Sequence, residues 1–204
     1  YPRWIQSAVF YQIFPDRFAK SSAEKKLPSW AVPREWSDLP KGRDKTTGVE
    51  FYGGDFPGIT GHLDYLKGLG VNSIYFTPAF PSRSNHRYDA TSFDEIDPLL
   101  GGDKAFIEFS EAAHTAGFRI MGDLTTNHCG AGHRWIQKAL KSKRAQEREF
   151  FYWDPSIPHG YEGWWGLASL PKLNYNSLRL RELMFSGKNS VVRKWLNPPF
   201  SMDG

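Results

Sequence analysis

Three short apolar runs, separated by stretches with helical periodicity, constrain the fold of this chain more than any other feature. The runs are "AVFYQIF" (residues 8–14), "VNSIYFTP" (71–78) and "FRIMGDL" (118–124). Each run is apolar on both faces, which is typical of parallel strands that helices cover. The order strand, helix, strand, helix, strand therefore predicts βαβ units in an α/β fold.

The two stretches between the runs carry apolar residues at helical spacing, namely Leu63, Leu66 and Leu69 in the first and Phe106, Phe109 and Ala113 in the second. Thr60 and Asp103 are expected to cap the starts of these helices. Gly70 and Gly117 are expected to end them, because glycine readily adopts the left-handed conformation at a helix C-terminus.

The connections after the strands are long, whereas those after the helices are short. Residues 19–50 and 82–98 are polar and read as loops, and a loop as long as the first is uncommon without a function. Long loops after parallel strands are typical of a barrel or open sheet whose function gathers at the C-terminal strand ends.

The remaining third of the chain breaks this alternation. A helix is expected over about residues 132–149, and an aromatic segment rich in Gly and Pro follows it. We interpret residues 130–175 as an insertion or small subdomain. Helical character returns over residues 177–196, with a weak point at Ser186 and Gly187.

Composition narrows the classes of function. The chain has 204 residues, 40% apolar and 24% charged, with a net charge of +4, which describes an ordinary globular protein. No run approaches about eighteen apolar residues, so no membrane span is expected.

Glu147 and Glu149 interrupt the basic residues of 138–148, which favours a solvated helix face over a nucleic-acid surface. The single cysteine, Cys129, excludes an internal disulfide. A reducing compartment fits this composition but is not required, so we expect a cytoplasmic location, with secretion as the alternative.

Polar residues follow the third run in "MGDLTTNHCGAG", where Asp123, Asn127 and His128 lie at the expected end of a strand. They either form part of a functional site or only satisfy loop backbone and one another. His128, Cys129 and His133 match no common zinc spacing. Calcium prefers oxygen ligands and Asn127 could supply one, although no run rich in Asp and Asn follows the first strand.

Two further motifs lie in the loops that follow the other strands. "NHRYDA" places His86, Arg87, Tyr88 and Asp89 on the same expected loop face as the third-strand motif. "FYGGDFPGITGHL" lacks the ending of a phosphate-binding loop, and we interpret it as a tight turn that delivers Asp55 and starts a helix. The chain contains no G-x-S-x-G motif for a serine nucleophile.

Taken in order, the motifs resemble the catalytic domain of the alpha-amylase family of glycoside hydrolases. The matching segments are "VFYQIFPDRFA" (9–19), "YGGDFPGITGHLDYLKGLGVNSIYFTPAF" (52–80), "NHRYD" (85–89), "DLTTNH" (123–128, the family's D-x-x-x-N-H) and "LPKLN" (170–174). The last is similar to the form in neopullulanases, cyclomaltodextrinases and maltogenic amylases. "YEGWWG" is also similar to amylase-pullulanases.

The resemblance implies a TIM-type (β/α)8 barrel, of which this chain would hold the first three βα units. Residues 1–128 would form the first part of the barrel, and residues 129–176 a small domain inserted after the third strand. Residues 177–204 would form the third barrel helix and the approach to the fourth strand. Because three strands leave open sheet edges, we expect a marginal fold or completion by a second copy, as in a strand-exchanged dimer.

The same resemblance assigns roles to the motif residues. His128 would hydrogen-bond the glucosyl unit at the cleavage site, and Tyr88 would stack on that ring. Asp123 would position an arginine expected on the next strand. His86 and Asp89 would support these residues, and Asn127 would support the inserted domain and bind calcium in relatives that keep the ion.

The family's chemistry is retaining hydrolysis, which needs two carboxyl groups about 5 Å apart. The family's nucleophile lies in a fourth-strand motif resembling D-G-x-R-x-D, whereas this chain ends at "SMDG". We therefore expect a fragment of a retaining α-glucan hydrolase that cleaves α-1,4 bonds, or both α-1,4 and α-1,6 bonds, in starch-like or maltodextrin substrates. The fragment would supply substrate-binding residues. It would lack nucleophile and general acid and be inactive alone. The alternative is a non-catalytic amylase-like module for sugar binding or interaction.

Overall fold

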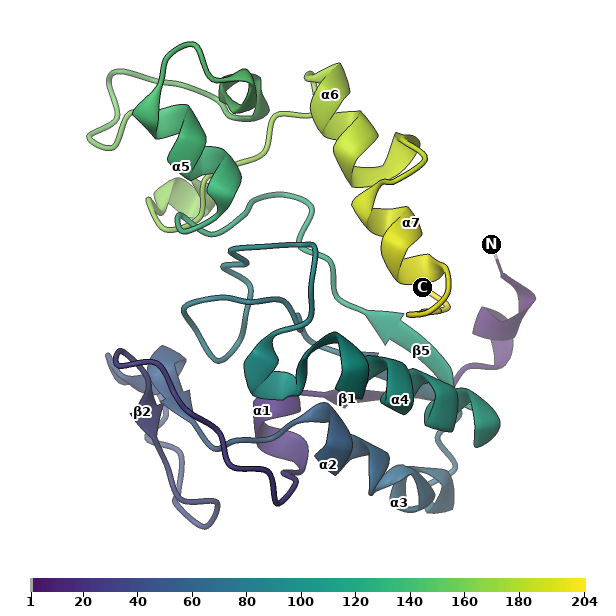
Figure 1. Ribbon diagram of the computed structural model, residues 1–204. Coiled ribbons are helices and arrows are strands. Elements are labelled where there is room, and N and C mark those ends of the chain that lie inside the picture. Colours follow the sequence, from purple (N-terminus) through teal and green to yellow (C-terminus); the bar gives the residue numbers. More distant parts are fainter. Residues whose placement is uncertain (1) are drawn as a thin grey trace.

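Three parallel strands form the centre of the computed structural model, which describes residues 2–204. They are β1 (Phe10–Ile13), β4 (Ser73–Phe76) and β5 (Arg119–Gly122), in the order β1-β4-β5 (Figure 1). Because the strands are in register and parallel, their C-terminal ends lie side by side. The predicted βαβ organisation is confirmed.

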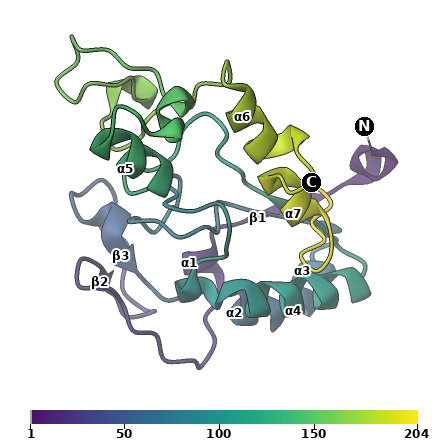
Figure 2. The ribbon, with the colours of Figure 1, turned by 45° about the horizontal axis from the view of Figure 1, so that its top comes forward.

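The sheet packs one face against the helices α2 (Phe56–Thr60), α3 (Leu63–Gly68) and α4 (Gly102–Thr115). Ile74 and Phe76 of β4 are buried, and the ring of Phe56 lies 5.5 Å from Phe76 and 4.9 Å from Phe106. Figures 1 and 2 show these three helices together, with α5 (Arg134–Lys141), α6 (Leu178–Arg181) and α7 (Val191–Leu196) on the opposite side of the molecule. Burial of this aromatic cluster stabilises the βαβ units.

The first helical stretch begins earlier than predicted, so the assignment of Thr60 as a cap is wrong. The Asp55 carboxylate accepts the Gly58 N–H at 2.8 Å and caps α2. Thr60 is the last residue of α2, and its hydroxyl donates to the Phe56 carbonyl. A proline in the first turn favours this earlier start, because proline needs no N–H partner there. Gly70 ends the second short helix with φ +78°, as predicted.

The predicted cap of the second helix is also wrong. Gly101, with φ +102°, precedes α4, and the Asp103 carboxylate instead accepts the Ile96 N–H at 2.7 Å. Asp103 thus ties the preceding loop to the helix. The predicted buried face of Phe106, Phe109 and Ala113 is confirmed.

The shorter elements lie mainly in the connections. They are η1 (Arg3–Ser7), α1 (Pro15–Phe18), β2 (Val32–Pro33), η2 (Thr47–Val49), β3 (Glu50–Phe51), η3 (Pro98–Leu100), η4 (Gln146–Phe150), η5 (Trp164–Gly166) and the π-helical turn η6 (Glu182–Ser186). The long first loop is not wholly irregular, because β2 and β3 pair in a second, parallel sheet. The predicted break at Ser186 and Gly187 separates η6 from α7.

The segment predicted as one helix over about residues 132–149 is α5 followed by a turn and η4. The chain then makes isolated antiparallel bridges, among them Phe151 with Leu173 and His128 with Lys172. The second bridge joins this irregular segment to the motif that follows β5. The segment is therefore attached to the C-terminal end of the sheet.

The last residues run along the outer edge of β5. The Asp203 N–H donates to the Ile120 carbonyl at 2.8 Å, and the Gly122 N–H donates to the Gly204 carbonyl at 3.0 Å. The Asp203 carboxylate also pairs with Arg119 at 2.7 Å. Contrary to the expectation of an open edge, this edge has partners at Ile120 and Gly122. Among residues 2–204, no helix has the length and apolarity needed to cross a membrane.

Candidate functional site

Two tyrosines hold the carboxylate that follows β5. The Tyr75 hydroxyl donates to Asp123 Oδ2 at 2.5 Å, and the Tyr88 hydroxyl donates to the same oxygen at 2.9 Å. Burial, together with the Asp123 charge, raises the pKa of both phenols, so they remain protonated donors at neutral pH. Tyr75 was missed by the sequence reasoning. The available signal was its position between Ile74 and Phe76, which turns it to the opposite face of the sheet.

His128 presents a buried nitrogen without a hydrogen-bond partner among residues 2–204. The residue is only 5% exposed, and Nε2 is the atom without a partner. Nδ1 lies 3.3 Å from the Asn127 side-chain amide. Burial lowers the pKa of His128, although the Tyr88 carbonyl and the Asp89 charge act in the opposite direction. The imidazole is therefore neutral near pH 7 and can serve a polar, uncharged ligand.

The loop after β4 divides its side chains between the cavity and the core. Arg87 has φ +60° and is fully buried, with its Nε donating to Asp97 Oδ2 at 2.7 Å. His86 and Tyr88, on either side of it, line a cavity. Arg87 therefore belongs to the core and fixes the loop, whereas the sequence placed it with its neighbours in one polar group.

Asp89 fastens the same loop from within. Its carboxylate accepts the Arg83 N–H at 3.2 Å and the Ser84 hydroxyl. The Ser84 hydroxyl also lies 3.2 Å from His86 Nδ1. Burial lowers the pKa of His86, against the opposing effect of Asp89. Asp89 does not line the cavity, so its contribution is to hold His86 in place.

The cavity at the C-terminal end of the sheet has a volume of about 720 Å³. Its lining residues come from the loops after β4 and β5 and from the irregular segment: His86, Tyr88, Asp123, Thr125, Thr126, Asn127, His128, Trp164 and Leu170. It thus brings together five residues that the sequence singled out, namely His86, Tyr88, Asp123, Asn127 and His128.

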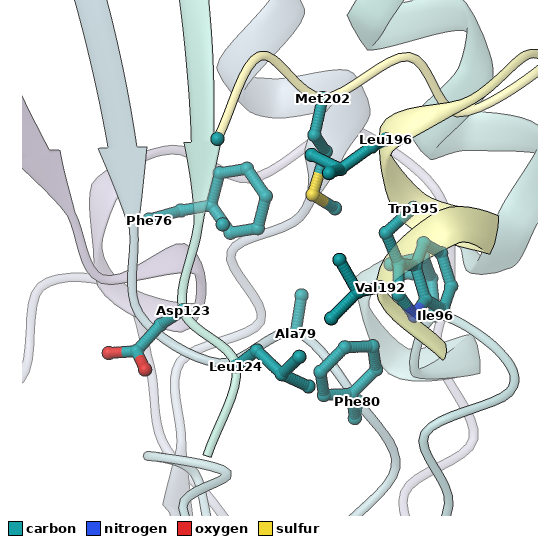
Figure 3. Close-up of a pocket in the computed structure, with 12 residues that line it drawn as sticks. Phe76, Ala79, Phe80, Ile96, Asp123, Leu124, Val192, Trp195, Leu196 and Met202 are labelled. Atoms are coloured by element: carbon teal, nitrogen blue, oxygen red, sulfur yellow. The ribbon is translucent and has the colours of Figure 1, made fainter. Parts of the chain in front are cut away.

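A second cavity, of about 180 Å³, lies between the sheet and α7 and is lined almost entirely by apolar side chains such as Phe80, Leu124 and Trp195 (Figure 3). Asp123 lies on its border, and Figure 3 shows the carboxylate pointing away from the apolar side chains. The polar chemistry therefore belongs to the larger cavity.

The positions of the acidic, histidine and cysteine side chains give little support for a metal site. Across residues 2–204, no three of these side chains converge in a way that could hold a metal ion. Cys129 is fully buried, and burial raises the pKa of its thiol, which disfavours the thiolate that zinc requires. The role of Asn127 toward calcium stays a prediction.

The larger cavity is suited to an uncharged ligand rich in hydroxyl groups. Tyr88 offers an aromatic ring, His128 adds an imidazole, and Asp123 adds a carboxylate. Of the residues between 2 and 204, Asp123 is the single carboxylate on the cavity wall. The arrangement therefore contains binding groups without a second carboxyl group beside Asp123.

Comparison with known proteins gives a consistent result. The family model "Alpha amylase, catalytic domain" matches residues 12–204. The chain is 34% identical over 206 residues to an intracellular maltogenic amylase of Bacillus subtilis, covering 100% of this chain and 33% of that protein. It is 34% identical over 236 residues to an amylopullulanase of Thermoanaerobacter thermohydrosulfuricus, covering 97% of this chain and 16% of the relative.

Two solved structures agree with these relatives. The type III pullulan hydrolase from Thermococcus kodakarensis superposes with a TM-score of 0.86 at 31% identity, covering 98% of this chain and 37% of the other. The cyclic alpha-maltosyl-(1→6)-maltose hydrolase from Arthrobacter globiformis, in its maltose complex, superposes with a TM-score of 0.83 at 33% identity. This match covers 100% of this chain and 44% of the other. The chain spans a third or less of the two curated relatives described above.

Proposed function

Since the chain belongs to the alpha-amylase family of glycoside hydrolases, we propose that it forms the substrate-binding part of an α-glucan hydrolase. In this proposal β1, β4 and β5 are the first three strands of a TIM-type barrel, in residues 1–128. Residues 129–176 are the inserted domain, and residues 177–204 contain the third barrel helix and lead to the fourth strand. The nucleophile and general acid are supplied by other parts of the protein.

The observation that carries this proposal is the unpartnered Nε2 of His128, buried at the wall of the cavity that Tyr88 and Asp123 share. A buried polar atom normally has a hydrogen-bond partner, and its absence costs free energy. The atoms that now cover Nε2 would have to move aside for a sugar hydroxyl to restore that partner. The ring of Tyr88 would then pack on the sugar face while its hydroxyl stays on Asp123.

The substrate is an α-glucan oligosaccharide or polysaccharide, cleaved at α-1,4 bonds and also, by analogy with the cyclic alpha-maltosyl-(1→6)-maltose hydrolase, at α-1,6 bonds. Water is the acceptor in the proposed reaction. We further propose a cytoplasmic location, because a relative that the chain matches along its whole length is named an intracellular enzyme.

The test is a kinetic comparison in the protein that contains the remainder of the barrel. His128→Ala should lower kcat/KM on maltodextrin at least about tenfold, because a hydrogen bond that strengthens at the transition state is lost. The control is His62→Ala, since His62 is exposed and bonds only within its own helical region. Unchanged kinetics in His128→Ala would contradict the assignment.

One observation favours a second candidate, a non-catalytic sugar-binding module: Asp123 is the single carboxylate on the cavity wall among residues 2–204. The same kinetic experiment separates the two functions. Release of reducing sugar by the longer protein supports the hydrolase. Binding of maltodextrin without any release supports the module.

A further inference from the structure

Two consecutive tryptophans continue the site beyond the cavity. The rings of Trp164 and Trp165 are stacked, with centroids 4.3 Å apart and planes at 9°. Trp164 lines the cavity and also stacks on the imidazole of His128, at 5.3 Å and 27°. The three rings therefore form a column that begins at His128 and ends at Trp165.

The outermost ring of this column faces solvent. Trp165 is 84% exposed, whereas Trp164 is 37% exposed. Because Trp164 covers one face of the Trp165 indole, the opposite face carries most of the exposure. An indole contributes strongly to stability when it is buried, so Trp165 contributes little to the core in this position. It is Trp164 that stacks on His128.

The backbone at Trp165 is held in a conformation that a bulky residue rarely adopts. Its φ and ψ are +52° and +28°, in the left-handed region, where the Cβ of a non-glycine residue is crowded. Hydrogen bonds on either side impose this turn: the Trp164 N–H donates to the Leu170 carbonyl at 2.9 Å, and the Leu167 N–H donates to the Trp164 carbonyl at 3.0 Å. Glycine would fit the turn without strain, but it would present no ring.

Gly163 allows the turn to close. A Cβ at that position would lie 2.1 Å from the Leu167 carbonyl oxygen, so only glycine permits this approach. The antiparallel bridge between Gly163 and Pro171 then joins the turn to the "LPKLN" segment. The exposed ring is thus presented by a defined turn, and backbone strain of this kind is concentrated at functional sites.

We propose that the open face of Trp165 is a platform for a further glucosyl unit of the α-glucan whose neighbouring part occupies the cavity of Tyr88 and His128. This inference rests on the proposed function, and it adds a second place of contact along the same sugar chain. The apolar face of a pyranose ring can pack flat on an indole, which gains contact area without requiring a charged partner. The continuous column from His128 to Trp165 sets the direction in which the sugar chain leaves the cavity.

The platform predicts a dependence on the length of the sugar chain. In titration calorimetry with the 204-residue chain, Trp165→Ala should weaken the binding of maltoheptaose about five- to tenfold, as expected for the loss of one aromatic contact. Maltotriose can occupy the cavity alone, so its affinity should change less than about twofold. The matched control is Leu167→Ala, which removes another exposed apolar side chain from the same turn and should leave both affinities within about twofold.

A second variant separates binding from folding. Trp165→Gly also removes the ring but relieves the left-handed backbone, so it should weaken maltoheptaose as much as Trp165→Ala does while its melting temperature is higher than that of Trp165→Ala. Wild-type affinity for maltoheptaose in either variant overturns the platform. An equal loss for maltotriose and maltoheptaose also overturns it, because Trp165 would then act within the cavity.

The proposed function and the platform fail in different ways. If the unmodified chain binds maltoheptaose and Tyr88→Ala abolishes that binding while Trp165→Ala does not alter it, the platform alone is overturned. If the unmodified chain unfolds cooperatively, and is therefore folded, but binds neither sugar, the proposed function is overturned and the platform with it. Binding that depends on both Tyr88 and Trp165, with the length dependence described above, supports both.

Discussion

The Asp97→Asn substitution should strongly destabilise the chain, because it leaves a buried guanidinium without its counter-ion. Arg87 is 0% exposed and Asp97 is 5% exposed. The Arg87 Nη1 donates to the Asn85 carbonyl at 2.7 Å, but Nη2 has no partner among residues 2–204. Asparagine keeps nearly the same shape as aspartate and can still accept the Leu99 N–H that Asp97 accepts at 2.9 Å. The substitution keeps the volume, but it removes the charge and, with Oδ1 still bonded to Leu99, places an NH2 donor against the Arg87 Nε–H.

The expected loss of stability is large for a single atom change. Removing one member of a buried ion pair typically costs about 3–5 kcal/mol, whereas replacing both members by neutral groups is often close to neutral. A domain is stable by only about 5–15 kcal/mol, so Asp97→Asn should remove roughly a fifth or more of the total. The double variant Arg87→Met/Asp97→Asn should recover at least about 2 kcal/mol of the loss.

Urea unfolding followed by tryptophan fluorescence measures these differences. The loop that Arg87 anchors also carries Tyr88, so Asp97→Asn should additionally weaken maltoheptaose binding under conditions in which the variant remains folded. A loss below about 1 kcal/mol, the range of exposed pairs, would refute the reasoning. So would a double variant less stable than the single one.

Three further predictions concern the neighbourhood of the site. Burial lowers the pKa of His133 to about 3, so below about pH 6.5 the unfolded chain binds more protons than the folded one. The contribution of His133 to stability should therefore be complete above about pH 6.5 and fall as the pH drops toward about 3. His133→Asn should flatten this slope in melting curves. Gly130→Ala should cost roughly 1–3 kcal/mol in urea unfolding, because its Cβ would lie 2.1 Å from the Asp89 carbonyl oxygen. Tyr75→Phe removes a 2.5 Å hydrogen bond to Asp123 and should cost about 1–2 kcal/mol and weaken maltoheptaose binding in calorimetry.

Each of these predictions has a matched control. His62→Asn makes the same change at an exposed histidine and serves as the control for His133→Asn. Gly68→Ala adds a Cβ with no atom within 4 Å, so it should not destabilise the chain. Tyr65→Phe alters a tyrosine that is 55% exposed and should leave both stability and binding as they are. A control that behaves like its partner variant would contradict the corresponding reasoning.

The sheet could be predicted from the sequence because apolar runs leave few alternatives. Residues such as Ile74 and Ile120 are buried on a parallel strand, and the polar residues after them gather where parallel strands end. Helix starts were harder to predict. Thr60 and Asp103 have the right chemistry for a cap, but Asp55 competes for the first helix, and the Ile96 N–H competes for the Asp103 carboxylate.

The finer structure of the site depended on tertiary contacts that the sequence does not display. Arg87 carries a charge, so pattern alone places it at the surface, whereas its partner Asp97 allows complete burial. Tyr75 lies within an apolar run, and its bond to Asp123 follows only from the strand register. Trp165 resembles a core residue by composition, and only the left-handed turn places its ring in solvent.

The most direct test of the account is to observe which residues of the chain respond to an α-glucan. In a titration with maltoheptaose followed by ¹H–¹⁵N NMR, the imidazole Nε2 of His128 and the backbone amides of Tyr88 and Thr125 should show the largest shifts. Amides of α3, on the far side of the sheet, should not move. Saturable shifts confined to residues outside the cavity, or an unchanged His128 imidazole at saturation, would contradict the central claim that this cavity binds the sugar.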